Sequence, residues 1–91
     1  MKEYIAFWYV SDAFDQWIET STHKTLDDAQ GSAFKNASRN GTHLYAWVIE
    51  STLISIRDGW TYTDAWSNNA DSGAWSGWKR DLEHISLSDY A

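Results

Sequence analysis

Three histidines and the carboxylates near one of them are the residues of this chain whose types suit acid–base or metal chemistry. His23, His43 and His84 lie far apart in the sequence, and none has the H-x-x-x-H spacing that holds a metal on one helix face. Asp81 lies three residues before His84 and Glu83 directly before it, a composition found in acid–base pairs and equally in solvated charged turns. We interpret it as a turn, and we expect no catalytic residue and no metal site.

Nucleophile and ligand motifs are incomplete in the same way. Residues 73–77 read Gly-Ala-Trp-Ser-Gly, which displaces Ser76 from the middle of the G-x-S-x-G nucleophile motif. The absence of cysteine removes thiolate nucleophiles and cysteine zinc sites. Asn68, Asn69 and Asp71 supply oxygen ligands, but the closing glutamate of a twelve-residue calcium loop is missing. The sequence therefore predicts a protein that is not an enzyme and needs no cofactor.

The chain contains seven tryptophans, more than one small core is expected to bury. Each ring has about 150–250 Å² of surface to bury. One small core cannot cover that area for all seven rings. Trp8 and Trp47 lie in apolar segments and are predicted to be core residues, whereas Trp17 fits either environment. Aromatic side chains left at a surface are typical anchors of protein recognition. The sequence thus favours a binding protein.

The last third of the chain supplies the candidate binding surface. Its predicted apolar centre consists of Tyr62, Trp66, Trp75 and Trp78, and its predicted acidic rim consists of Asp64, Asp71 and Asp81. Such a surface would complement a basic region of another protein. The alternative is that Trp75 and Trp78 close over the sheet as a lid.

The first elements that must position these residues are a hairpin and a helix. Residues 4–10 are apolar on both alternating faces, which predicts a central strand, and residues 14–20 form its hairpin partner. Thr25 is placed to cap a helix over residues 26–39, whose apolar stripe is rich in alanine. This stripe is expected to pack on a sheet.

The remaining elements complete the predicted fold. Strands are expected at 44–50, 53–57 and 60–66, followed by a loop over 67–73. A glycine-bulged turn at Gly59 is expected to pair Ile56 with Trp60. The spacing from Trp75 to Ile85 predicts a short C-terminal helix, with a strand at 84–87 as the alternative. The prediction is an α+β domain over residues 1–91, with an antiparallel sheet of about five strands (β-β-α-β-β-β), one helix on a face and the short C-terminal helix.

Charge and composition restrict the class of partner and the cellular compartment that we expect. The net charge of −6 opposes binding to a phosphate backbone, so we expect no direct nucleic-acid contact. No segment is long and apolar enough to span a bilayer, and residues 1–20 do not have the pattern of a signal peptide. Because cysteine is also absent, we expect a cytoplasmic protein.

In size, acidity and the hairpin followed by Thr-Leu-Asp-Asp-Ala (25–29), the chain resembles accessory proteins of bacteriophages and mobile elements, such as anti-CRISPR and host-polymerase inhibitors. The resemblance implies an inhibitor in the cytoplasm of a bacterial host that occludes a basic or nucleic-acid-binding surface of a larger protein or ribonucleoprotein complex. An immunity-type protein that neutralises a toxin is one alternative. A tryptophan-lined carbohydrate-binding or phage structural module is another. A homodimer is compatible with each hypothesis.

Overall fold

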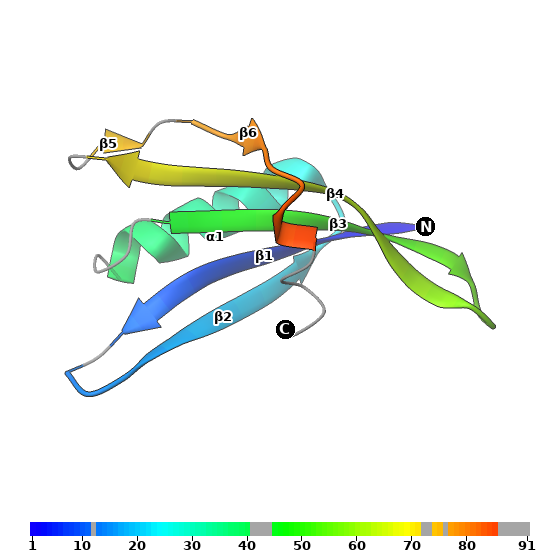
Figure 1. Cartoon of the computed structure of the whole chain (residues 1–91), viewed down its shortest axis with the longest axis horizontal. Helices are drawn as coiled ribbons and strands as arrows, with labels where there is room; N and C mark the ends of the chain where they lie inside the picture. Colours follow the sequence, from blue (N-terminus) through cyan, green and yellow to red (C-terminus); the bar gives the residue numbers. More distant parts are fainter. Residues whose placement is uncertain (12, 41–44, 72–73, 76, 86–91) are drawn as a thin grey trace.

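A computed structural model of the chain describes residues 1–11, 13–40, 45–71, 74–75 and 77–85. Along the chain the elements are β1 (Lys2–Ser11), β2 (Gln16–His23), α1 (Leu26–Asn40), β3 (Tyr45–Ser55), β4 (Gly59–Asp71), β5 (Ala74–Trp75) and β6 (Lys79–Arg80). The strands form an antiparallel sheet in the order β2-β1-β3-β4-β5, and β6 also pairs with β4 (Figure 1). The predicted α+β fold, with one helix on an antiparallel sheet, is confirmed.

The central position of β1 follows from its apolar sequence. It pairs with β2 from Tyr4 opposite His23 onward, and with β3 from Lys2 opposite Thr52 onward. A strand with neighbours on both edges and cover on both faces favours apolar side chains at consecutive positions. Ala6, Phe7 and Trp8 are accordingly all buried.

The helix begins and packs as its sequence predicts. The Thr25 hydroxyl accepts a hydrogen bond from the Asp28 amide at 3.2 Å, which satisfies a free donor of the first turn. Alanines along one stripe let the helix approach the sheet closely, and the large rings of the strands fill the remaining space. This layer contains Ala6, Trp8, Ala29, Ala33, Ala37, Ala46 and Val48.

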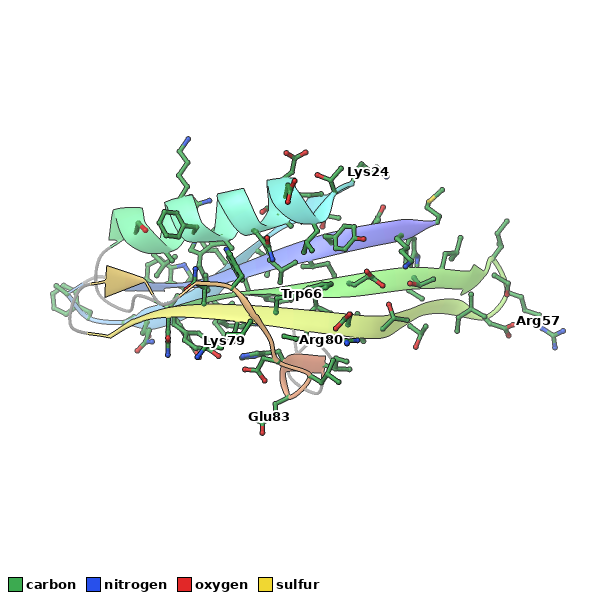
Figure 2. The ribbon with its side chains drawn as sticks, turned by 90° about the horizontal axis from the view of Figure 1, so that it is seen from above. Lys24, Arg57, Trp66, Lys79, Arg80 and Glu83 are labelled. Atoms are coloured by element: carbon green, nitrogen blue, oxygen red, sulfur yellow. The ribbon has the colours of Figure 1, made fainter. Side chains whose placement is uncertain are left out.

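The opposite face of the sheet is built on aromatic rings. Phe7 and Trp47 stack with their centroids 5.2 Å apart, and Ile49 and Ala65 complete the buried cluster. The turn that follows β6 packs on this face, where the His84 ring lies 5.1 Å from the ring of Trp47. Figure 2 shows α1 on one side of the sheet and this turn on the other. The prediction that Trp8 and Trp47 are core residues is confirmed.

Among the residues that the structure describes, the predicted short C-terminal helix is not found. Ala74–Trp75 and Lys79–Arg80 are strands that pair with β4, and Gly77 between them has a φ of 98°. A positive φ stops a right-handed helix, so the helical spacing of Trp75 and Trp78 does not correspond to a helix face. The alternative strand at 84–87 falls partly outside the described residues.

Two predicted strand boundaries were wrong. Ser51 and Thr52 do not interrupt a strand, because β3 runs continuously to Ser55. Residues 67–71 do not form a loop, because β4 continues to Asp71. Polar side chains are accommodated there by hydrogen bonds to the following segment: Asn68 Oδ1, for example, accepts a hydrogen bond from the Gly77 amide at 3.0 Å.

The turn between β3 and β4 has the expected glycine but a shifted register. Gly59 adopts a φ of 78°, as a glycine bulge requires. The structure pairs Ser55 with Gly59 and Leu53 with Trp60, so the predicted pairing of Ile56 with Trp60 was wrong. The Ser55 hydroxyl explains the shift, because it accepts a hydrogen bond from the Asp58 amide at 2.9 Å and so fixes a loop over residues 56–58.

Among the described residues, no helix combines the length and the apolar character needed to cross a membrane.

Candidate binding surfaces

The residues of the predicted patch lie on two faces of the sheet. Trp66 and Trp78 pack against the helix-side layer, and the Trp66 ring lies 6.3 Å from that of Tyr4. Tyr62 instead packs against the aromatic cluster on the opposite face. Both tryptophans are partly buried, and the position of Trp78 fits the alternative that Trp75 and Trp78 close over the sheet.

Two of the three acidic residues of the predicted rim, Asp64 and Asp81, have partners inside the molecule. Asp64 accepts a hydrogen bond from Nε of Arg80 at 2.8 Å, and Asp81 accepts one from the Ser67 hydroxyl at 3.1 Å. Asp71 and Trp75 occupy strand positions in β4 and β5, and their side chains lie outside the described part of the structure. Asp64 and Trp66 therefore lie together on the helix side, whereas Tyr62 and Asp81 lie on the other side.

An ionic cluster occupies the helix side of β3 and β4, beyond the alanine-lined layer. Lys2 Nζ lies 3.3 Å from Glu50 Oε1, which also accepts a 2.7 Å hydrogen bond from the Thr63 hydroxyl. Burial acts to raise the pKa of Glu50, but the hydrogen bonds from Thr63, Lys2 and Tyr4 outweigh it and lower that pKa. These contacts keep Glu50 ionised and tie the two strands together.

Arg80 completes this cluster from β6. Its hydrogen bond is the main cause of the lowered pKa of Asp64; burial acts to raise that pKa, while the Ala65 amide and the charge of Arg80 add to the lowering. Arg80 is largely exposed, so the pair contributes little stability but fixes where β6 lies against β4. We therefore assign this cluster a structural role.

A second polar cluster, formed by Tyr45, Ser67, Asp81 and His84, lies on the aromatic face. The Tyr45 hydroxyl is hydrogen-bonded to His84 Nε2, and the same nitrogen lies 3.3 Å from Asp81 Oδ2. Burial lowers the pKa of His84, although the nearby carboxylates of Asp81 and Glu83 act to raise it. Burial likewise raises the pKa of the Tyr45 hydroxyl. Both groups are therefore held in their uncharged forms near neutral pH.

This cluster holds the turn after β6 against the aromatic face of the sheet. The Ser67 hydroxyl donates to Asp81 rather than to His84, so serine and histidine do not form a nucleophile–base pair. Nδ1 of His84 is buried and has no hydrogen-bond partner in the described structure. Within the same residues, no three His, Cys, Asp or Glu side chains are grouped so as to hold a metal ion.

The most exposed apolar side chains of the hairpin formed by β3, β4 and the turn between them lie at its end. Strand β1 reaches only to Lys2, opposite Thr52, so the rest of the hairpin projects beyond the sheet, with Arg57 at its far end (Figures 1 and 2). Ile56 is 98% exposed, Ile54 59% and Trp60 41%. These three residues, here called the hairpin tip, present an apolar surface to solvent.

A second exposed apolar region lies at the other end of the long axis, in the β1–β2 hairpin. Phe14 in its loop is 98% exposed, and Trp17 and Ile18 at the start of β2 are 40% and 45% exposed. Trp17 Nε1 donates a 3.3 Å hydrogen bond to Glu19, so the indole lies along the strand. Strand β2 is the outermost strand on this side of the sheet, and its first five side chains are all exposed.

The hairpin tip was not predicted from the sequence. Ile54 and Ile56 were expected in a paired strand, where an alternating apolar pattern normally indicates a buried face. The projection comes from register rather than length: β3 has 11 residues and β1 has 10, but Lys2 lies opposite Thr52, which leaves the end of β3 beyond β1. No local feature of the sequence signals such an offset between two strands.

Comparisons of the chain with protein-family models, with curated proteins and with solved structures found no match.

Proposed function

We propose that this chain is a small binding protein that acts by occupying a surface of a larger protein, with the hairpin tip as its apolar anchor. The observation that carries the proposal is the exposure of Ile54, Ile56 and Trp60 on a hairpin that projects beyond its own sheet. Large apolar side chains of this kind gain most when they enter a pocket that excludes water. Their position at one end of the molecule suits insertion into a concave surface.

The charge of the chain supports a basic partner. The net charge is −6, and among the described residues Lys2, Lys24 and Arg80 are each bound to a carboxylate. The field around the molecule is therefore negative, which speeds association with a positive surface and disfavours nucleic acid. A nucleic-acid-binding groove of a larger bacterial protein or ribonucleoprotein complex has the required charge.

Together these properties are those of an inhibitor that blocks by occupation, in the manner of phage and mobile-element inhibitors acting in a bacterial cytoplasm. An immunity-type protein that neutralises a basic toxin would use the same surface. The identity of the captured partner distinguishes these two hypotheses.

The test is affinity capture from a bacterial lysate with the parent chain and two matched variants. Ile56→Ser changes the hairpin tip, and Phe14→Ser changes an equally exposed loop residue at the opposite end. We expect a basic partner that the parent and Phe14→Ser recover equally and that Ile56→Ser loses. Titration of the purified partner should then show an affinity loss of about tenfold or more for Ile56→Ser.

Either of two results would overturn the proposal. Recovery of the partner by both variants alike would exclude the hairpin tip as the anchor. Failure of the parent to retain any partner across lysates of several bacterial hosts would contradict the binding function itself.

A further inference from the structure

In the part of the chain that the structure describes, the outer edge of β2 has no paired strand, and of the charged residue types Asp, Glu, Lys and Arg the strand contains Glu19 alone. The strand is eight residues long, reads Gln-Trp-Ile-Glu-Thr-Ser-Thr-His, and contains neither proline nor lysine. Such an edge presents a row of backbone donors and acceptors to any strand that fits it. Figure 1 shows β2 along the margin of the sheet.

We propose that this edge pairs with the same edge of a second copy of the chain, giving an antiparallel β2–β2 junction and a continuous sheet through a dimer. This inference does not depend on the proposed function, because the hairpin tip lies at the end of β3 and β4 and stays free in such a dimer.

Symmetry restricts the register of such a junction. In an antiparallel pair, residues that lie opposite each other point to the same face of the sheet. A two-fold axis perpendicular to the sheet must therefore pass beside one residue of β2 rather than between two residues. With the axis at Thr20, Ile18 lies opposite Thr22 and Trp17 lies opposite His23. Thr20 of one chain then lies opposite Thr20 of the other. Nearly all of the strand is used, and the opposed pairs are β-branched, aromatic or hydroxyl-bearing, which stabilise sheets.

The neighbouring symmetric registers are poorer. An axis at Glu19 would set two glutamates against each other, and like charges directly opposite are destabilising. An axis at Ser21 would set Ile18 against Lys24 and leave Trp17 beyond the paired strand. The axis at Thr20 places Glu19 opposite Ser21 instead, so no like charges face each other along β2.

The other edge of the sheet explains why the assembly should stop at two copies. The outer edge of β4 is already paired with β6 at Trp66 and Ser67, and with β5 at Ala70 and Asp71. Toward the hairpin tip, β4 has a register shift opposite Glu50 and Ser51, and bulges of this kind twist an edge away from pairing. Within the described residues, β2 is thus the longest regular open edge, and pairing of this edge with its own copy gives a closed dimer rather than a fibre.

The absence of cysteine in the chain allows a sharp test of the register by cross-linking. Thr20→Cys should form an intermolecular disulfide under mild oxidation, because directly opposed Cα atoms lie about 4.5–5.5 Å apart, within the range of about 4.4–6.8 Å that a disulfide spans. An equimolar mixture of Ile18→Cys and Thr22→Cys should form the mixed disulfide in preference to either homodimer. Ser38→Cys, exposed on α1, is the control and should remain monomeric in denaturing gels.

The strength of the junction is tested by light scattering and sedimentation across a concentration series. The parent chain should form a dimer, and Thr20→Lys should raise the dimer dissociation constant at least about tenfold by setting two like charges against each other. Ser38→Lys makes the same change in charge away from the edge and should leave the dimer intact. Circular dichroism and the melting temperature of monomeric Thr20→Lys confirm that the fold survives.

Three outcomes would overturn the inference. A parent chain that stays monomeric at every concentration shows that β2 does not pair with its own copy, and an edge reserved for a strand of another protein would then be the explanation. A dimer that Thr20→Lys and Ser38→Lys weaken equally is held by another surface. A dimer in which Thr20→Cys cross-links no better than Ser38→Cys has another register.

Discussion

On one face of the sheet, α1 covers β1 and β3 with alanines that carry no polar side-chain atoms. On the other face, a short turn covers Trp47 with a histidine ring held by hydrogen bonds to Tyr45 and Asp81. Both coverings bury the rings of the sheet. The first depends only on packing, whereas the second also depends on the protonation state of His84.

This contrast indicates where mutations and solution conditions can act on the molecule. An alanine-lined contact responds to volume, because protein interiors are close-packed and a larger side chain has nowhere to go. A buried histidine responds to pH, because burial penalises its charged form. Substitutions on each face should therefore give different signatures.

The largest effect is expected from Trp47→Ala on the aromatic face. Trp47 is 2% exposed and stacks on both Phe7 and His84, so its removal leaves a cavity and frees the turn. We expect a loss of about 3–5 kcal/mol in the free energy of unfolding, measured by urea denaturation. Trp60→Ala at the exposed hairpin tip is the control and should lie within about 0.5 kcal/mol of the parent. Equal losses in the two variants would contradict the assignment of Trp47 to the core.

A smaller loss is expected from Ala33→Leu on the helix face. Ala33 is completely buried between α1 and the sheet, so added methyl groups must push the helix outward. Overpacking of this kind costs about 1–3 kcal/mol of unfolding free energy. Ser38→Leu, an exposed position on the same helix, is the matched control and should be nearly neutral. An unaltered melting temperature for Ala33→Leu would show that the two layers are not closely packed.

The smallest effect is the pH dependence that His84 gives to the aromatic face. Burial lowers the pKa of folded His84 below its unfolded value, so between those two values the unfolded chain binds more protons. Its contribution is complete above about pH 6.5 and is lost as the pH falls toward the folded pKa. Urea denaturation at pH 7.5 and pH 5.5 should show this loss in the parent and in the His23→Gln control, but not in His84→Gln. A slope that survives in His84→Gln would show that another group causes it.

The sequence predicted the helix face well and the aromatic face only in part. Capping by Thr25 and the spacing of alanines are local signals, and they are sufficient to identify α1 and the side on which it packs. The continuous apolar character of β1 also predicted correctly that both faces would be covered. What covers the second face was not predicted, because the hydrogen bond between His84 and Tyr45 joins residues that lie 39 positions apart in the sequence.

The candidate surfaces show the same limit. Trp66 and Trp78 were predicted as exposed anchors from their polar sequence surroundings, yet they pack against the helix-side layer. Exposure of Ile54 and Ile56 follows from the register of β3 relative to β1, which only the strand pairing reveals. The open edge of β2 likewise depends on the order of strands in the sheet.

The two faces also contain their own spectroscopic reporters. The indole nitrogens of Trp8, on the helix side, and of Trp47, on the aromatic side, are buried without a hydrogen-bond partner in the described structure. Each indole proton is therefore shielded from water and exchanges with deuterium only when its own side of the sheet opens. The exchange rates of these two indole protons, measured by nuclear magnetic resonance, would thus report the opening of each layer separately, with no label added to the chain.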